Sequence, residues 1–466
     1  MTSGLRPYSG YRPSGLKWVG DLPEHWSIER AKWLFRKMER PVREGDEVVT
    51  CFRDGVVTFR RNRRVTGFTE SLKEIGYQGI RRGDLVIHGM DAFAGAVGVS
   101  DSDGKGTPVY SVCAPAPGVN PHYYAFVVRE MARSEWILAL ARGIRERSSE
   151  FRFGEFGSQR VPLPPHLEQV AIVRYLGQAD RRLRRYTATK KKIVGLLGER
   201  RQAVIDRAVT RGVGSGHDLQ QLGSAPAVQV KSGWETSRLW TVASLRSEKN
   251  RPNLALLSVF LGRGVIPYGD GGGQVHKPSL DLSGYQVVYP GDLVLNNQQA
   301  WRGSVGVSRY HGIISPAYVV LRLSSKLDPR FAAHLFSSRS VVAQYVTSSK
   351  GVGDIQRDLY VPWLKNIRIP IPPLEEQVAI ANHLDLRLAD VIREVRQSEK
   401  EIELVQEFRR RLVSDVVTGK LDVREAATQL PDWNEELDVL VGDEPALDDQ
   451  AGGELEAEEA ADEGDG

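Results

Sequence analysis

The sequence predicts a mixed α/β (α+β) protein of two globular domains in tandem, each followed by a long helix. Two observations lead to this fold class. One unit occurs twice along the chain with a constant offset of 208 residues. Within each copy, a segment rich in Gly, Val and aromatic residues is followed by a Pro-free segment rich in Glu, Arg, Lys, Leu and Val. A chain of 466 residues also exceeds the size of one ordinary core, so two or more domains are expected.

The repeat is visible in seven short motifs that occur twice at the same separation, which excludes coincidence. A unit of 208 residues is far longer than a solenoid repeat, so each copy is a domain with an appendage. The matched motifs are Trp26–Arg30 with Trp234–Arg238, Gly83–Val86 with Gly291–Val294, Gly95–Val99 with Gly303–Val307, Pro121 with Pro329, Arg160–Pro165 with Arg368–Pro373, Glu168–Ile172 with Glu376–Ile380, and Val209–Thr210 with Val417–Thr418.

The first part of each copy predicts a mixed domain with several short strands. Short apolar runs such as Asp84–His88 are bounded by turn residues, as expected for strands. We expect the two globular domains at residues 1–160 and 228–367, with a linker at 212–227.

The second part of each copy predicts a long helix, at 161–211 and at 368–420. A double Pro marks each helix entry, and Glu168 and Glu376 lie in the first turn, where the helix dipole favours an acid. Each Pro-free segment has about 44 residues, which gives a helix of roughly 65 Å.

Apolar residues recur near heptad spacing in both segments, so the two helices are expected to pair as a coiled coil. Lys190 and Ser398 interrupt the stripe at equivalent positions. They form either a polar layer that fixes the register or exposed slips of the heptad. The expected seam comprises Leu176, Leu183, Tyr186, Ile193, Leu197 and Val204 in the first helix, and Leu384, Val391, Val395, Ile402, Val405 and Leu412 in the second.

Charge is distributed very unevenly along the chain. Residues 432–466 carry 15 acidic and no basic side chains, which leaves 63 basic against 44 acidic residues in the rest. A basic body indicates a polyanionic partner, although a solvated surface with a solubilising tail is the alternative. We expect residues 421–466 to form an acidic disordered tail, which either screens the basic surface or binds a partner.

The composition excludes several classes of protein. Two cysteines, Cys51 and Cys113, allow neither a disulfide framework nor a cysteine-based metal site. The first 20 residues are polar and lack the apolar core of a signal peptide, and no apolar stretch is long enough to cross a bilayer. We expect a cytoplasmic protein.

A search for chemistry yields no catalytic and no metal-binding residues. Nucleotide-binding, adenine-methyltransferase and zinc-binding spacings are absent, and Gly269–Gln274 lacks the Lys of a phosphate-binding loop and is interpreted as a mobile loop. Asp84 and Asp292 recur at equivalent positions and could mark an active site. A turn that leads into a strand explains Gly-Asp equally well, and we favour the turn.

These features together resemble the specificity subunit of type I restriction–modification enzymes. The resemblance covers the chain to about Val423. The doubled pattern of Pro-Pro, Glu-Gln, a long helix and Val-Thr is highly specific. The resemblance rests on Pro13–Trp26, on Pro164–Gln169 and Pro372–Gln377, and on Arg200–Thr210 and Arg409–Lys420.

The resemblance implies a division of labour between subunits. Each globular copy would be a target-recognition domain for one half of a bipartite double-stranded DNA target, and the helices would pair antiparallel and set the gap. Modification (methyltransferase) subunits, for which we expect a pair, would dock on the helices, and restriction (translocase and nuclease) subunits would cleave. S-adenosylmethionine, ATP and Mg would be bound by these partners, with no cofactor on this chain and no membrane. A stand-alone methyltransferase or nuclease and a protein-binding coiled-coil scaffold are the alternatives.

Two kinds of segment are expected to contact DNA. Basic runs suit phosphates, and the amides Asn296–Gln299 suit adenine edges; the equivalent stretch in the first copy, His88–Ala94, has different chemistry. Variable surface loops without DNA contact are the alternative. The candidate residues are Arg60, Arg61, Asn62, Arg63, Arg64, Arg142, Arg145, Asn296, Asn297, Gln298, Gln299, Arg302 and Lys350.

Overall fold

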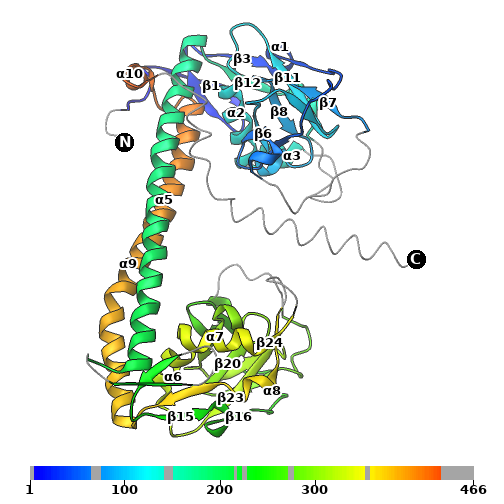
Figure 1. Ribbon diagram of the computed structural model, residues 1–466. Coiled ribbons are helices and arrows are strands. Elements are labelled where there is room, and N and C mark those ends of the chain that lie inside the picture. The colour runs from blue at the N-terminus through cyan, green and yellow to red at the C-terminus, as the bar shows by residue number, and fades with distance from the viewer. Residues whose placement is uncertain are drawn as a thin grey trace. The chain divides into compact units, whose positions relative to one another are not determined.

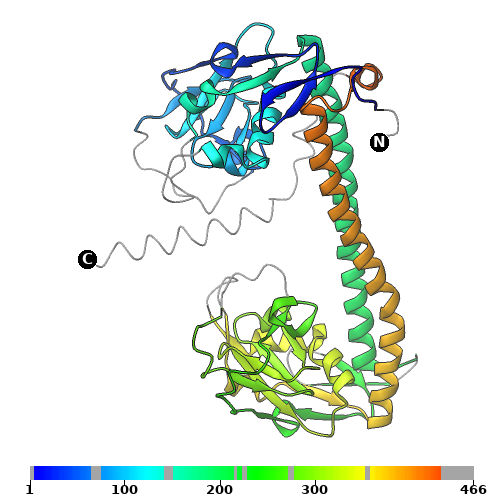
Figure 2. The ribbon, with the colours of Figure 1, turned by 180° about the vertical axis from the view of Figure 1, so that it is seen from behind.

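The chain divides into two compact units (Figures 1 and 2). The computed structural model describes residues 5–63, 75–140, 151–214, 218–222, 228–270, 278–351 and 357–431. Unit 1 is Met1–Thr189 with Ile402–Gly466, and unit 2 is Lys190–Glu401. The division passes through both long helices, α5 (His166–Arg211) and α9 (Leu374–Val417), so each unit holds part of both.

A four-stranded antiparallel sheet forms the centre of unit 1, in the order β4 (Phe35–Lys37), β11 (Tyr110–Pro115), β8 (Leu85–His88) and β9 (Val97–Val99). Side chains alternate between the two faces of the sheet. Leu85 and Ile87 pack towards helix α2 (Pro121–Arg133), and Val86 packs towards the hairpin of β5 (Val49–Cys51) and β6 (Val57–Phe59). The other elements are β1 (Tyr11–Leu16), β2 (Gly20–Pro23), β3 (Ser27–Arg30), α1 (Ala31–Leu34), β5 (Val49–Cys51), β6 (Val57–Phe59), η1 (Arg60–Asn62), β7 (Gln78–Ile80), η2 (Ala92–Ala94), β10 (Gly104–Gly106), α3 (Trp136–Leu140), α4 (Phe153–Ser158) and β12 (Arg160–Leu163).

Unit 2 repeats this arrangement with a sheet in the order β16 (Ala243–Leu245), β23 (Tyr318–Leu323), β20 (Asp292–Asn296) and β21 (Val305–Val307). Its other elements are β13 (Leu219–Gln221), β14 (Gln229–Lys231), β15 (Glu235–Arg238), η4 (Leu239–Thr241), β17 (Leu257–Phe260), β18 (Gly264–Pro267), η5 (Tyr268–Asp270), β19 (Gln286–Val288), η6 (Ala300–Arg302), β22 (Gly312–Ile314), α6 (Pro329–Phe336), α7 (Arg339–Thr347), β24 (Ser349–Lys350), β25 (Asp358–Leu359), α8 (Val361–Leu364) and β26 (Arg368–Ile371).

The two units share strand register residue for residue. Leu85 pairs with Val99 in unit 1, and Leu293 pairs with Val307 in unit 2. Seven described strand pairings of unit 1 recur in this way in unit 2 at the offset of 208. A slip by one residue would turn the apolar set of a strand away from its core, so shared register implies a shared packing scheme. The predicted duplication is therefore present in three dimensions.

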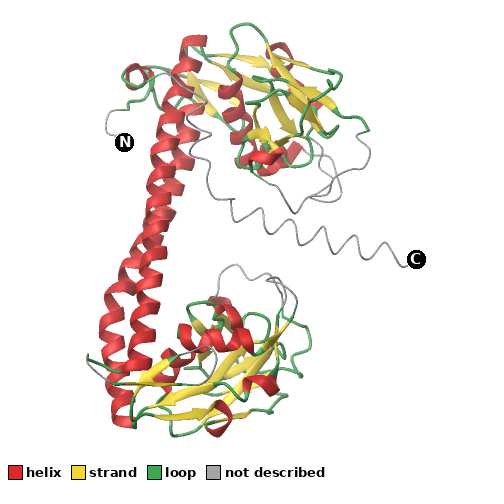
Figure 3. Cartoon of the chain, viewed as in Figure 1, coloured by secondary structure: helices red, strands yellow, loops and turns green. Residues whose placement is uncertain are grey.

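The long helices pair antiparallel within each unit, and the predicted mixed α/β fold with two long helices is confirmed (Figure 3). In unit 1, Leu176 near the start of α5 shares a core with Leu412 near the end of α9. In unit 2, Ile205 near the end of α5 shares a core with Leu384 near the start of α9. Neither these helices nor any other described helix combines the length and apolarity needed to cross a membrane.

The seam between the helices differs from the expected one at two positions. Tyr186 and Ile193 are 42% and 39% exposed, whereas their neighbours Thr187 and Val194 are half-buried. A stripe with a strict heptad repeat rotates by about 20° per heptad around a straight helix. The buried positions of α5 therefore shift by one residue, from Tyr186 and Ile193 to Thr187 and Val194. Leu176, Leu183, Leu384, Val391 and Leu412 are buried, and Leu197, Val204, Val395, Ile402 and Val405 are half-buried.

The polar interruption of the seam is packed rather than exposed. Ser398 is only 6% exposed, and the Lys190 ammonium lies 2.6 Å from a carboxylate oxygen of Glu401. Of the two interpretations of these residues, the burial favours a polar layer over an exposed slip of the heptad.

Several expected boundaries move in the structure. The segments expected to be helical from 161 and from 368 begin instead with strands β12 and β26, because the double Pro separates strand from helix, and the helices start at His166 and Leu374. The acidic tail was expected from 421, but Val423 and Ala427 of the segment around α10 (Arg424–Thr428) are buried in the core of unit 1. This apolar i, i+4 pair anchors the segment, and Asp422 N–H donates 2.8 Å to the Arg6 carbonyl. The expected linker at 212–227 contains strand β13, which pairs with β14. Residues 432–466 lie outside the described part of the chain.

A Glu-Gln pair at the start of each long helix ties that helix to its domain. The Glu168 carboxylate accepts from the Trp26 indole N–H at 3.0 Å, from His25 Nε2 at 2.9 Å and from the Tyr8 hydroxyl. The Glu376 carboxylate accepts from the Trp234 indole N–H at 2.9 Å and from Lys231 at 2.7 Å. The tryptophans are equivalent by the repeat, so the same bond recurs in both units.

The neighbouring glutamines join the helix to the first turn of the domain's own helix. Gln169 accepts from Asn120 N–H at 2.9 Å and donates to the Pro164 carbonyl at 2.9 Å. Gln377 accepts from Asp328 N–H at 2.8 Å and donates to the Pro372 carbonyl at 2.8 Å. Asn120 and Asp328 are the N-caps of α2 and α6. In each unit, the glutamine side chain therefore links the start of the long helix to the start of the domain's own helix.

We expect Gln169→Ala and Gln377→Ala each to lower the free energy of unfolding by about 1–3 kcal/mol, because each leaves buried backbone groups without their partner. Urea denaturation monitored by circular dichroism measures the change. Gln397→Ala, at an exposed position of α9, is the matched control and should remain within about 0.5 kcal/mol of wild type. Equal effects of all three changes would contradict this role.

Candidate nucleic-acid interface

Each unit brings two candidate loops together by one equivalent backbone bond. The Phe151 N–H donates 2.9 Å to the Gly89 carbonyl in unit 1, and the Leu359 N–H donates 2.9 Å to the Asn297 carbonyl in unit 2. Each bond joins two segments that are distant in sequence. One is the turn that follows β8 or β20, and the other contains Phe151 in unit 1 or β25 in unit 2. The candidates Arg142 and Arg145, which precede Phe151 in the sequence, lie outside the described residues.

The turn after the central strand has the same geometry in both units but a different acceptor. In unit 2 the Asn296 side-chain oxygen accepts from the Gln298 and Gln299 N–H groups at 3.0 and 3.2 Å. In unit 1 the Asp91 N–H donates 3.2 Å to Nδ1 of His88, which is the residue equivalent to Asn296. Nδ1 accepts only when the ring is neutral, and burial lowers the pKa of His88 despite the nearby Asp91 carboxylate.

The four consecutive amides of unit 2 differ in their contacts and exposure. Asn296 holds the turn, and Asn297 donates from its side chain to Asp358 at 3.4 Å and from its backbone to Ala317. Gln299 is half-buried, and Gln298 is exposed. The amide run therefore offers Gln298 as its most accessible side chain for a base edge.

Basic and aromatic side chains surround these amides. The Lys350 ammonium lies 3.4 Å from the Tyr360 ring centre and 5.4 Å from that of Trp363. Arg302 is exposed and lies over Trp301. Lys350 and the amide run were separate candidates in the sequence, and the β24–β25 hairpin places them in one region of unit 2.

The arginine run of unit 1 follows β6 as the short helix η1. Arg61 pairs with Glu47, and the Arg63 guanidinium lies 2.8 Å from Asp54. Arg60 donates to the Thr50 hydroxyl at 3.3 Å, and Asn62 donates to the Thr58 hydroxyl at 2.8 Å. Arg64 lies outside the described residues.

The same hairpin reaches the other candidate loop of unit 1 through an ion pair. Arg53, in the β5–β6 turn, lies 3.0 Å from the Asp91 carboxylate. The arginine run and the His88–Ala94 turn are thus parts of one region, which the sequence alone did not indicate. Arg53, Trp301, Arg357, Tyr360 and Trp363 were missed as site residues, because their signal depends on contacts between segments distant in sequence.

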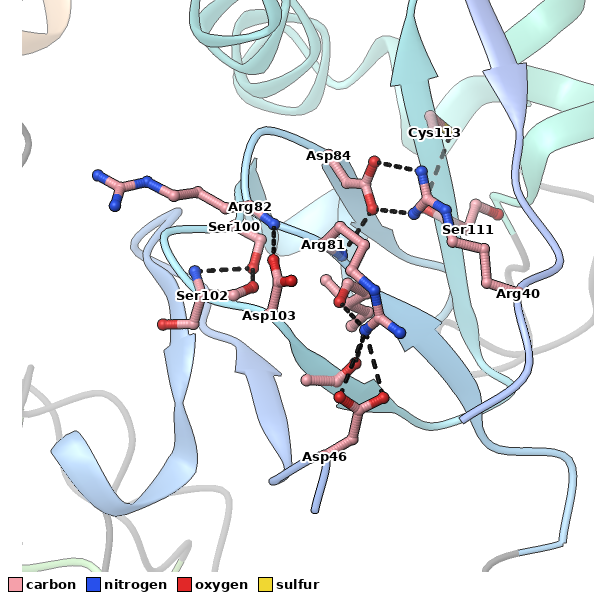
Figure 4. Close-up of polar contacts among 12 residues, drawn as sticks. Arg40, Asp46, Arg81, Arg82, Asp84, Ser100, Ser102, Asp103, Ser111 and Cys113 are labelled. Atoms are coloured by element: carbon pink, nitrogen blue, oxygen red, sulfur yellow. Dashed lines mark hydrogen bonds and ion pairs between the residues drawn. The ribbon is translucent and has the colours of Figure 1, made fainter. Parts of the chain in front are cut away.

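Asp84 and Asp292 have structural roles. Asp84 accepts from the Arg81 N–H at 2.8 Å, which closes the turn before β8, and pairs with Arg40 (Figure 4). Asp292 accepts from the Tyr289 N–H at 2.9 Å and pairs with Arg246 at 2.6 Å. Both carboxylates are buried and satisfied, as the turn interpretation requires. Within the described ranges, no group of three metal-ligating side chains lies together.

Comparisons with known proteins agree with the resemblance seen in the sequence. Residues 231–404 match the family model "Type I restriction modification DNA specificity domain". The type I restriction enzyme MjaVIII specificity subunit of Methanocaldococcus jannaschii is 25% identical over 287 residues, which cover 58% of this chain and 64% of that protein. The "Putative type I restriction enzyme MjaX specificity subunit" of the same organism is 21% identical over 428 residues, which cover 87% of this chain and 96% of that protein.

A solved structure has the same fold. A chain from work on complex assembly and conformational transition of the type I R-M system has a TM-score of 0.59 at 16% identity, covering 85% of this chain and 98% of that chain. The matches are to DNA specificity domains and specificity subunits. The predicted resemblance is confirmed, and the matches agree with the expectation of a non-catalytic subunit.

The neutral acceptor at His88 predicts a dependence of unit 1 stability on pH. Its pKa is lowered in the folded chain, so below the ordinary His pKa of about 6.5 the unfolded chain binds more protons and stability falls. We expect the free energy of unfolding to fall between pH 7 and pH 5, and His88→Asn, which copies Asn296, to reduce this fall. Urea denaturation at several pH values measures both proteins; parallel curves would contradict the assignment.

Proposed function

Because this chain is related to the specificity subunits of type I restriction–modification enzymes, we propose that it is the DNA-specificity subunit of such a complex. Each unit recognises one half of a bipartite double-stranded target. The observation that carries the proposal is the combination of shared register with unlike turn side chains: His88–Ala94 in unit 1 and Asn296–Arg302 in unit 2. Two equivalent scaffolds with different side chains suit two different half-sites.

The charges on the two regions suit DNA in different ways. In unit 1, arginines paired with Asp54, Glu47 and Asp91 can exchange these acids for phosphates. In unit 2, Gln298 and Arg302 are exposed and have the chemistry that recognises base edges. The excess of 63 basic over 44 acidic residues outside the C-terminal 35 residues supports a polyanionic ligand.

The long helices set the gap between the half-sites and receive the partner subunits. Helices of 46 and 44 residues that pair antiparallel in both units are stiff spacers. Exposed leucines along them, Leu196, Leu386 and Leu404, offer apolar contacts for modification subunits, of which a pair is expected. Restriction subunits complete the complex, and S-adenosylmethionine, ATP and Mg are bound by these partners, not by this chain.

Changing Arg60, Arg61, Arg63 and Arg64 together to Ala should weaken binding to any duplex and flatten the salt dependence. Each lost phosphate contact reduces the slope of log K against log[salt] by about 0.9. Gel-shift titration of the full chain between low and high salt measures both. Arg424→Ala, paired with Asp422 away from the hairpin, is the control and should leave the slope unchanged. An unchanged slope in the fourfold variant would exclude phosphate contact.

Changing Gln298 and Gln299 to Ala should relax recognition of one half-site and leave the other intact, because amides discriminate adenine by about 1–3 kcal/mol per bidentate pair. Methylation mapping of cells that express the complete system gives the two halves separately. An unchanged target would remove the amides from the site. Methyl transfer by the isolated chain would instead favour a stand-alone enzyme, and failure to bind any duplex would favour a protein scaffold.

A further inference from the structure

Trp301 lies in the turn that follows the central strand of unit 2. Its indole N–H donates 2.8 Å to the Gln298 carbonyl, within the same turn. The turn is itself held by the Asn296 side chain, which accepts from two backbone N–H groups. The ring is therefore fixed at its polar end to a turn that has little freedom of its own.

Two guanidinium groups lie against this ring. The Arg302 carbon Cζ is 4.6 Å from the ring centre and that of Arg357 is 5.3 Å from it, both within the range of cation–π attraction. Arg357 comes from the other loop, which the Leu359 N–H to Asn297 carbonyl bond closes onto the turn. The indole thus gathers side chains from two loops beside the exposed Gln298.

The sequence of unit 1 has different side chains at the positions equivalent to these residues. Met90, Phe93, Ala94 and Ser149 stand where unit 2 has Gln298, Trp301, Arg302 and Arg357. The described arginine that reaches this turn of unit 1, Arg53, is paired with Asp91. Among the described residues, a pair of arginines on one aromatic ring beside this turn is thus found in unit 2 and not in unit 1.

We infer that Trp301 is a positioning residue that holds Arg302 and Arg357 beside Gln298, so that unit 2 presents two guanidiniums and one amide to base edges. The inference rests on the proposed function and extends it to the chemistry of the target. The half-site of unit 2 contains at least one G·C pair whose guanine O6 and N7 accept from an arginine. Stacking on the ring orders each guanidinium before binding, which reduces the entropy lost on recognition.

The test is selection of binding sites by the full chain from a pool of randomised duplexes. Arg302→Ala combined with Arg357→Ala should reduce the preference for guanine roughly tenfold at one or more positions of one half-site and leave the other half-site unchanged. Trp301→Ala should have the same effect with both arginines present. Trp301→Phe keeps a ring and should retain part of the preference, which a loss of folding would not do.

Two controls separate this role from a general loss of charge or stability. Arg238→Ala removes an exposed arginine from β15 of the same unit and should leave both half-sites unchanged. Phe93→Ala, at the position equivalent to Trp301, should leave the half-site of unit 2 unchanged. This inference is overturned if wild type selects a two-part sequence and both the double arginine variant and Trp301→Ala select the same sequence. If wild type selects no sequence, the proposed function itself fails.

Discussion

The hydrogen bonds of one Glu-Gln pair at the start of each long helix are the contacts on which the rest of the architecture depends. Glu168 and Glu376 accept from the indole of a tryptophan that lies between two strands, β2 and β3 or β14 and β15. The adjacent glutamines bind the N-cap of the domain's own helix. A long helix could otherwise rotate or slide against its domain, because an apolar stripe alone constrains register weakly. Buried, fully paired polar groups remove that freedom, since any slip leaves them without partners.

In both units the arginines of the candidate regions lie over aromatic rings, and in unit 1 they also pair with carboxylates. In unit 1 the arginines of the β5–β6 hairpin are paired with carboxylates, so a phosphate must displace an acid that is already bound. In unit 2, Arg302 and Arg357 lie over one ring, that of Trp301, which attracts both cations. Under the proposed function, exchange of the ion pairs favours phosphate contacts that depend on salt, and stacking on one ring orders two guanidiniums before they meet a base.

The sequence predicted the features that depend on local pattern. The offset of the repeat, the helix entries and most of the helix seam follow from periodicity and from capping residues, which act within one or two turns. The expected seam differs from the observed burial at Tyr186 and Ile193, because a strict heptad repeat does not stay on one face of a straight helix. The contacts of Trp301 with Arg357 and of Arg53 with Asp91 could not be predicted, because they depend on the closure of distant loops.

Specificity can vary in this architecture without a change of fold. The turn after the central strand is closed by the same backbone bond in both units, and it ends in a glycine with positive φ, Gly95 or Gly303. The side chain that accepts a hydrogen bond within the turn is the imidazole of His88 in unit 1 and the amide of Asn296 in unit 2. The two accept from equivalent backbone N–H groups, those of Asp91 and Gln299. Since the backbone of the turn is satisfied by either residue, the side chains that point outward are free to differ. Under the proposed function, the duplicated scaffold would fix where each half-site is recognised, and the turn residues would decide which bases are preferred.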